Sequence, residues 1–507
     1  MSQPAQPTNA LRTFLKWGGI ALLLTAAVWI GVIIWWQTTH RVISFTDVLL
    51  YLIVLPFFLL LCIGIFKLMR AIARKKANAS AAFSTGEKSN DPAGTVDANT
   101  IEKKLKLPIV GAWAVTSLAN NAEEFVQALI EKRSRPRPDQ LLLDARGFPL
   151  PSGRVMDLDI QTVQQKLSQT IAKNGLNNVP DSEEWRDAFL RTLALLDQVI
   201  DQAHNEWPLE FETADEARES QSIGTLRGAA PVRSNTKKSL SLQIKLLIPA
   251  DFKPYEKQLS LAYLFEKISI FTIPAKQVHI EVVAASDDVT ALSLMDKFSI
   301  QTHRNGANEA LLLLAGDSTL CPTVAEDWHS AGRLFSTHCP NGLMMGEAAF
   351  GVLCINNKAL KSTTLEAQCQ LTRVSFDKRD SSADQPGKPS YTCLAETMND
   401  ALITADLSGE KIGTVACDAD HRTNRTLECI GAMMNLTPQL DAIENRLAAN
   451  EACGHIGTAS VLGAFVAGVT QVKNANHPIL LFNVSHMVER AAAVLLPNDD
   501  TPDLHEA

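Results

Sequence analysis

Two histidines and one serine are the residues of this sequence that could do chemistry. His455 stands in ACGHIGTASVLGAF, residues 452–465, and His421 stands in DHRTNRT, residues 420–426. An imidazole can act as a general base, or it can donate a hydrogen bond where negative charge develops. Ser286, in AASDDVTALSLMDKF, could act as a nucleophile if a histidine lay within about 3 Å of its hydroxyl. Such a pair of serine and histidine would allow acyl transfer or hydrolysis, which is one alternative for this chain.

Each of these residues also has a structural interpretation. The small residues that follow His455 are spaced so that a glycine-rich turn could pack a buried helix closely against a sheet. His421 could be a hydrogen-bonded core residue, and the acidic pair Asp287 and Asp288 is typical of a helix N-terminal cap. The packing interpretation of His455 needs no neighbouring nucleophile, and we favour it.

Composition narrows the classes of function. The chain has 507 residues, 46% hydrophobic and 20% charged, which is ordinary for a folded protein. Its formal net charge of −8 argues against a general nucleic-acid binder, because binding phosphates needs a clustered excess of Lys and Arg. The nine cysteines are dispersed, without a CxxC pair or zinc-like spacing. We therefore expect reduced thiols, no metal site, no cofactor and no nucleic-acid partner.

Two apolar runs near the N-terminus predict a membrane hairpin, residues 1–76. The first, WGGIALLLTAAVWIGVIIWW at 17–36, has no charge and carries tryptophans near both ends. The second, VLLYLIVLPFFLLLCIGIF at 48–66, contains Pro56, which kinks a spanning helix without preventing it. A cleavable signal peptide is the alternative for the first run. That run lacks a small-residue cleavage site, however, and a second span follows closely.

The basic residues predict how the hairpin is oriented. Arg12 and Lys16 precede the first span and five Lys or Arg residues follow the second, whereas the connecting loop holds only Arg41. Both ends of the chain should therefore face the cytoplasm. We expect a flexible linker at 77–103, a folded domain at 104–497 with a surface insertion near 212–238, and an acidic tail at 498–507.

The folded part alternates short apolar runs with longer amphipathic stretches, which indicates the α/β class. The expected strands are residues 107–115, 240–248, 279–284, 310–315, 349–355, 371–375, 411–417 and 479–483. The expected helices are residues 122–132, 160–174, 182–202, 290–302, 395–401, 436–450 and 458–473.

Five segments, in order, resemble the β-ketoacyl synthases of the thiolase-like superfamily. They are LPIVGAWAVTSLANNAEEFVQALIEKRS at 107–134, GLMMGEAAFGVLCI at 342–355, DHRTNRT at 420–426, GHIGTASVLGAF at 454–465 and NVSHM at 483–487. The resemblance implies a thiolase-like five-layered αβαβα domain and, as one option, the homodimer usual for that family. In the family, two histidines bind a thioester carbonyl, and the resemblance places these roles on His421 and His455.

The resemblance also places the family's nucleophilic cysteine, and here that position is Ala285, with Ser286 beside it. Arg422 and Asn424 replace glycines of the family's HGTGT segment, and Asn450 replaces a lysine. A methyl group cannot attack a thioester. We therefore expect no catalytic residue: Ala285, His421 and His455 are vestigial family positions, and Ser286 is a weak alternative nucleophile.

A membrane hairpin joined to a degenerate thiolase-like domain resembles the type VI secretion adaptors that serve lipase effectors. The resemblance implies a non-catalytic adaptor whose protein partners are a lipase-type effector and a secretion spike protein. Two alternatives stay open. One is an active acyltransferase or hydrolase that uses Ser286. The other is a lipid or acyl-carrier binding protein at the inner membrane, for which a basic docking patch is expected and composition reveals none.

Overall fold

The computed structural model describes residue 29 and residues 102–498, apart from 133–135, 145, 177–178, 212–239, 272, 287–288, 386 and 388. The chain divides into two compact units, Met1–Gly94 and Thr95–Ala507. No helix within the described ranges is long and apolar enough to cross a membrane. The predicted spans, the surface insertion and the pair Asp287 and Asp288 lie outside the described residues, except for Trp29, which is helical.

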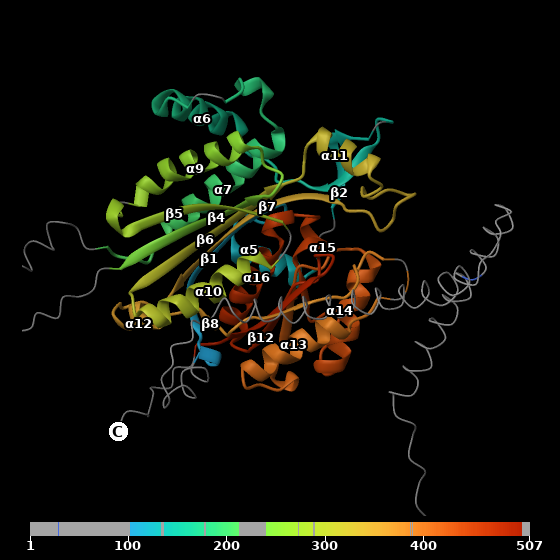
Figure 1. Ribbon diagram of the computed structural model, residues 1–507. Coiled ribbons are helices and arrows are strands. Elements are labelled where there is room, and N and C mark those ends of the chain that lie inside the picture. The colour runs from blue at the N-terminus through green and yellow to red at the C-terminus, as the bar shows by residue number, and fades with distance from the viewer. Residues whose placement is uncertain are drawn as a thin grey trace, which may run out of the picture. The chain divides into compact units, whose positions relative to one another are not determined.

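The second unit contains a large mixed sheet (Figure 1). Ten strands follow one another in the order β11-β10-β12-β13-β8-β1-β7-β6-β4-β5. Their bounds are β1 Leu107–Thr116, β4 Ser241–Pro249, β5 Val278–Ala285, β6 Glu309–Ser318, β7 Met345–Ile355, β8 Cys369–Leu371, β10 Thr414–Cys417, β11 Arg446–Ala448, β12 Ile479–Phe482 and β13 Glu489–Leu496. Three more strands lie off this path: β2 Arg137–Leu143, β3 Pro149–Gly153 and β9 Ser375–Lys378. Parallel pairs such as β4 with β5 and β6 mix with antiparallel pairs such as β1 with β7.

Helices cover the faces of this sheet in three groups. Their bounds are α5 Ala122–Ile130, α6 Ile160–Asn174, α7 Asp187–Asn205, α9 Pro254–Ile268, α10 Thr290–Asn305, α11 Pro322–Ser330, α12 Asn357–Lys361, α13 Thr392–Thr404, α14 Thr423–Leu436, α15 Ala449–Cys453 and α16 Ser460–Ala475. Apolar side chains of α6, α7 and α9 pack on one face of β1, β4, β6 and β7. Those of α13 and α14 pack on β10, β12 and β13.

Between these two sheet regions lies a central layer made by α5, α10 and α16. Figure 1 shows α16 in the middle of the molecule, with sheet on both sides. Because it is enclosed, α16 needs small residues: a Cβ added at Gly463 would lie 2.7 Å from the Phe350 ring, and one at Gly468 would lie 2.6 Å from Leu495. The layers of helices and strands therefore alternate as α, β, α, β, α. This arrangement brings the segments that contain Ala285 and His455 to the ends of strands.

Most of the expected elements are present, and two predictions are wrong. The helix expected at 436–450 is a turn followed by β11 and the start of α15, because the Asp441 carboxylate accepts from the amides of Ile443 and Glu444. The strand expected at 371–375 is interrupted between β8 and β9. There Asp296 accepts hydrogen bonds from Arg373 and from the amide of Val374, which takes this stretch out of the sheet.

Candidate functional site

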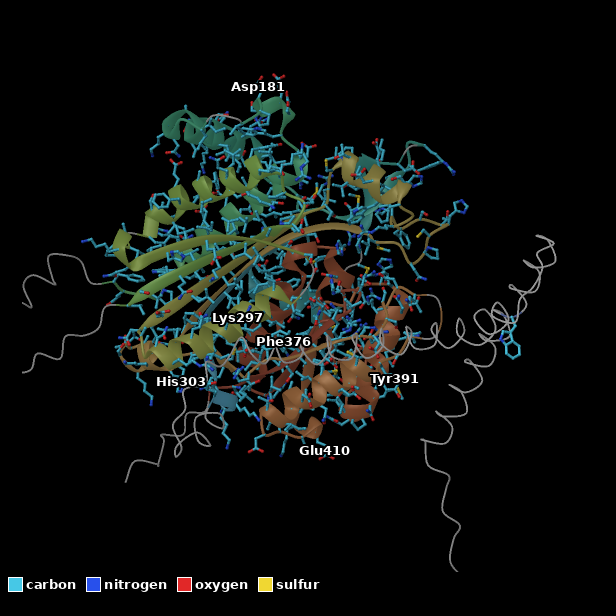
Figure 2. All side chains as sticks on the ribbon, in the orientation of Figure 1. Asp181, Lys297, His303, Phe376, Tyr391 and Glu410 are labelled. Atoms are coloured by element: carbon cyan, nitrogen blue, oxygen red, sulfur yellow. The ribbon has the colours of Figure 1, made fainter. Side chains whose placement is uncertain are left out.

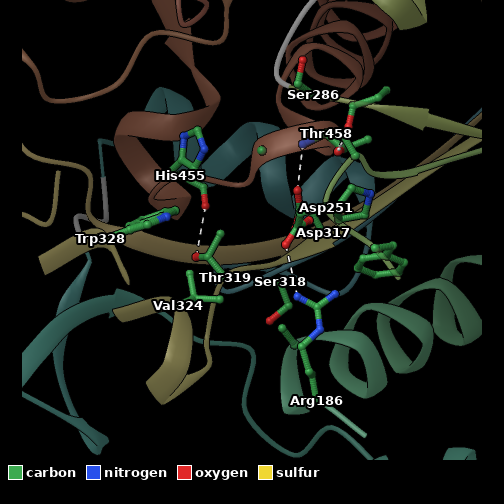
Figure 3. Close-up of a pocket in the computed structure, with 16 residues that line it drawn as sticks. Arg186, Asp251, Ser286, Asp317, Ser318, Thr319, Val324, Trp328, His455 and Thr458 are labelled. Carbon is green, nitrogen blue, oxygen red and sulfur yellow. Dashed lines mark hydrogen bonds and ion pairs between the residues drawn. The ribbon is translucent and has the colours of Figure 1, made fainter. Parts of the chain in front are cut away.

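Ala285, Ser286 and His455 line one pocket of about 220 Å³ (Figure 3). Ala285 is the last residue of β5, and His455 follows the short helix α15. The fold thus brings the expected nucleophile position and the second histidine position together, although 170 residues separate them in the chain. His421 is not among the residues that line this pocket.

The nucleophile position holds a buried methyl group fixed by its neighbours. Ala285 is 4% exposed. Its carbonyl oxygen accepts a hydrogen bond of 2.9 Å from Thr458 Oγ1, and the Thr458 amide donates at 2.9 Å to Asp317 Oδ2. The turn before α16 is therefore bonded to the ends of both β5 and β6. Ser286 is exposed, and Figure 3 shows its side chain directed away from the His455 ring.

His455 is held by its backbone and by an aromatic neighbour. Its amide donates to the Met344 carbonyl at 2.8 Å, and its carbonyl accepts from Thr319 Oγ1 at 3.5 Å. Its ring meets the Trp328 ring edge to face, with the ring centres 5.5 Å apart. Because indole covers one side of the imidazole, a substrate has less access to it.

His421 lies in a separate and mostly buried environment. Its ring is edge to face with Phe335 at 5.2 Å, and it is hydrogen-bonded to the backbone of Gly342. Its Nε2 is buried and has no hydrogen-bond partner among the described residues. Burial lowers the pKa of His421, because the imidazolium loses solvation, so the ring is neutral at physiological pH.

One segment, residues 328–344, contacts both motif histidines. Trp328 and Phe335 contact their rings edge to face, and the backbones of Gly342 and Met344 are hydrogen-bonded to them. In the sequence, residues 328–341 carry no pattern that marks them as part of a site, whereas Gly342 and Met344 belong to the family-like segment at 342–355. The part that residues 328–341 take in the site is found only through contacts with residues about 100 positions away. Both histidines therefore serve as packing partners for this segment.

Charged side chains fill the space around the His421 segment. Arg422 and Arg425 both donate to the Ser485 carbonyl at 3.2 Å, and both pair with Asp384, at 3.3 and 2.7 Å. Arg425 is fully buried. Burial raises the pKa of Asp420, but the charge and hydrogen bonds of Arg422 outweigh that effect, so this pKa is lowered. Arginine side chains thus occupy the region where glycines of the resembled family leave room.

Asn450 joins the same region to the central helix. Its Nδ2 donates to Ser460 Oγ at 3.0 Å and to Ser485 Oγ at 3.3 Å. This is a short polar bridge between the start of α16 and the loop after β12. Because an amide carries no net charge, it cannot supply the electrostatic effect of the lysine that it replaces in the family pattern.

A buried ion pair lies behind the pocket. Glu347 accepts from Arg191 of α7, and it also accepts from Ser318 Oγ at 2.8 Å and the Val155 amide at 2.7 Å. Each oxygen of this buried carboxylate has a donor, so the group orients β7 against α7. Sequence patterns assign no role to Arg191, because a lone arginine in an amphipathic helix is indistinguishable from a surface residue.

The described part of the chain resembles solved ketosynthase structures. No protein-family model and no curated protein matches the sequence. The ishigamide ketosynthase/chain length factor has a TM-score of 0.50 at 15% identity, over 78% of this chain and 100% of that chain. A ketosynthase from module 6 of the bacillaene synthase from Bacillus subtilis 168 has a TM-score of 0.50 at 12% identity, over 78% and 72%.

A third structure, a type II PKS acyl-carrier protein in complex with its ketosynthase bound to the hexaketide, has a TM-score of 0.51 at 11% identity. The match covers 78% of this chain and 100% of that chain. At such identities the likeness shows the fold alone. The α/β thiolase-like ketosynthase fold is therefore confirmed.

Proposed function

We propose that this chain is a non-catalytic adaptor that uses a ketosynthase-like fold to bind protein partners. Ala285 carries the proposal. It stands at the position that the resemblance gives to the nucleophile, and its side chain is a buried methyl group. A methyl group forms no covalent acyl intermediate. A large folded surface without a nucleophile is suited to holding another protein.

The environments of the two histidines support the same proposal. A catalytic imidazole needs an open path to the reacting carbonyl. The His455 ring lies against Trp328, and the His421 ring lies against Phe335. Arg422 and Arg425 bridge to the Ser485 carbonyl in the region where an acyl chain would need space.

The partner classes come from the resemblance to type VI secretion adaptors. A lipase-type effector would bind the cytoplasmic domain and be presented to a secretion spike protein. The predicted hairpin, residues 1–76, would hold the chain at the bacterial inner membrane, with the domain in the cytoplasm. Homodimer formation is compatible with this proposal and is not required by it.

One alternative function has a specific observation in its favour. Ser286 and His455 line the same pocket, so an acyltransferase or hydrolase that uses Ser286 is the second candidate. A serine hydroxyl needs a base in hydrogen-bond contact, because its pKa is far above that of a thiol. In Figure 3 the Ser286 side chain does not point toward the imidazole.

Two measurements on the purified full chain test the proposal. In the first, the chain is incubated with acyl thioesters and acyl-carrier substrates, and intact mass reports covalent adducts. We expect no adduct at Ser286. An adduct on wild type that is lost in Ser286→Ala would establish the second candidate instead.

In the second, the chain is incubated with lipase-class effectors and spike proteins encoded beside it. We expect a stable complex that Ser286→Ala forms equally well. A chain that binds neither class of protein would contradict the adaptor proposal.

A further inference from the structure

A basic pocket lies at the end of β7 that is remote from His455. Its volume is about 320 Å³. Four basic residues line it: Lys106, His303, Lys358 and Lys361. Neutral polar side chains complete the lining: Ser299, Thr302, Asn356 and Asn357. Among the described residues that line it there is no aspartate or glutamate. A pocket with this lining favours an anion.

The fold assembles this pocket from three separate segments and holds them together. Lys106 directly precedes β1, His303 lies in the last turn of α10, and Lys358 and Lys361 lie on α12. The Asn357 side chain donates to the Lys106 carbonyl at 2.8 Å, and Lys358 Nζ donates to the Gly306 carbonyl at 2.6 Å. The pocket is therefore a fixed feature of the domain.

The lysines of this pocket have no acidic partner among the described residues, whereas His303 interacts electrostatically with Glu102. Neighbouring arginines are paired, Arg304 with Glu102 and Arg373 with Asp296. By contrast, no described carboxylate lies within ion-pair distance of any lysine that lines the pocket. The chain as a whole carries a formal net charge of −8. This basic surface is thus a local concentration of charge that the composition does not reveal.

A second pocket of about 560 Å³, with a mixed polar and apolar lining, adjoins the basic one and shares Leu105 and Lys106 with it. Its apolar residues include Ile403, Leu407, Pro478, Leu496 and Pro497. Ile403 is 67% exposed, and Lys104 and the acidic Asp406 also line this pocket. A cationic pocket beside exposed apolar side chains matches the two parts of an anionic phospholipid, the phosphate headgroup and the hydrocarbon.

The location of this surface points to the same partner. Both pockets flank residues 104–106, near residue 102, at which the described range of the folded domain begins and to which the predicted hairpin and linker lead. Figure 2 shows His303 at the end of the domain where Figure 1 labels α12. β7 has 11 residues, so its two ends are roughly 33 Å apart. Met345, at the other end, bridges to His455.

We propose that this surface docks the domain on an anionic membrane, with a phospholipid phosphate in the basic pocket and apolar lipid atoms against Ile403 and its neighbours. The domain then presents the end that carries His455 away from the membrane, where a soluble partner can approach. The proposal goes beyond the adaptor function and does not depend on it.

Hydrogen exchange on the full chain tests this proposal. The chain is mixed with vesicles of phosphatidylcholine, with or without phosphatidylglycerol, and exchange is followed in peptides that cover 102–107 and 357–361. We expect phosphatidylglycerol to slow exchange in both peptides. Each lysine near an anionic surface strengthens binding roughly fivefold. The double variant Lys104→Gln with Lys361→Gln should therefore need an about 25-fold higher concentration of phosphatidylglycerol-containing vesicles for half-maximal protection.

A matched control removes the same charge elsewhere. Lys173→Gln with Lys276→Gln alters two exposed lysines outside both pockets and should leave the protection as in wild type. Equal protection by phosphatidylcholine alone would overturn the proposal. So would full protection by soluble glycerophosphate without vesicles, because the pocket would then bind a free phosphate. Unchanged protection in the Lys104 and Lys361 variant would overturn it as well.

Discussion

The Thr458 hydroxyl donates a hydrogen bond of 2.9 Å to the carbonyl oxygen of Ala285, which lies 173 positions earlier in the chain. This bond joins the turn after His455 to the end of β5. It shows that the expected nucleophile position and the glycine-histidine segment form one packed unit.

Removing the Thr458 hydroxyl should destabilise the domain. Thr458→Val keeps the volume but leaves the buried Ala285 carbonyl without this donor, at a cost of about 1–2 kcal/mol. Thermal unfolding followed by tryptophan fluorescence measures the effect. Thr404→Val is the control, since that hydroxyl bonds only within its own helix near the surface, and it should cost less than about 0.5 kcal/mol. Equal losses would mean that the bond to Ala285 has no special role.

The stability of the domain should fall between neutral pH and mildly acidic pH because of His421. Burial lowers its pKa in the folded state. As the pH falls through the ordinary histidine pKa, near 6.5, the unfolded chain takes up a proton before the folded one does. The contribution of the neutral ring to stability is therefore complete above that pH and is progressively lost below it.

Urea unfolding at several pH values tests this linkage. His421→Phe should flatten the curve between neutral and mildly acidic pH, because the variant has no proton to bind at this position. His338→Gln, at an exposed histidine of the segment that covers the site, should keep the wild-type slope. A wild-type slope in His421→Phe would show that another group causes the pH dependence.

Glu428 should be among the most sensitive side chains of the domain. It is fully buried and pairs at 2.8 Å with both Arg490 and Arg379. Glu428→Gln leaves two buried guanidinium groups without a carboxylate, which should cost about 3–5 kcal/mol. Unfolding in urea measures this loss. Glu396→Gln, on the exposed face of α13, should be nearly neutral, and a loss below that range for Glu428→Gln would mean that solvent reaches the cluster.

The Glu428 cluster also explains why one helix was not predicted from the sequence. In α14 the buried positions are Arg425, Glu428, Cys429, Ala432 and Met433, which follow a helical repeat. Two of the five are charged, so a hydrophobic pattern does not detect the repeat. The helix was expected after residue 436, where Asp441 instead stabilises a turn. By contrast, α6 was predicted with correct bounds because its apolar positions follow the repeat directly.

The sequence predicts only those residues of the candidate site that lie in recognisable local motifs. The order of the segments around Ala285 and His455 indicated that the two would meet, and they line one pocket. Trp328 and Phe335, which cover the histidines, carry no local signal, because their role depends on contacts across the fold. The basic pocket was missed for the same reason: Lys106 and Lys361 are ordinary surface lysines until the fold brings them together.

The glycine before His455 should be required for packing, and a second glycine provides a matched control. Gly454 has φ +80°, and a Cβ there would lie 2.5 Å from the Met345 carbonyl oxygen. Gly147 has φ +81° and nothing within 4 Å of the same position. Gly147→Ala should therefore cost only the strain of a positive φ, about 1–2 kcal/mol. Gly454→Ala should cost about 1–3 kcal/mol more, because its ψ of −171° places it in a region essentially restricted to glycine and because the Met345 backbone cannot move away.

Thermal unfolding of the two alanine variants compares these sites, since a positive φ is common to both. If Gly454→Ala unfolds at a clearly lower temperature than Gly147→Ala, the backbone conformation of the turn and its close approach to Met345 explain why a glycine precedes His455. Binding of a partner by the folded fraction of Gly454→Ala should then be unchanged, because this glycine acts through stability alone. If the two variants unfold at the same temperature, the segment at 454–465 is not a packing device, and a direct role for His455 must be reconsidered.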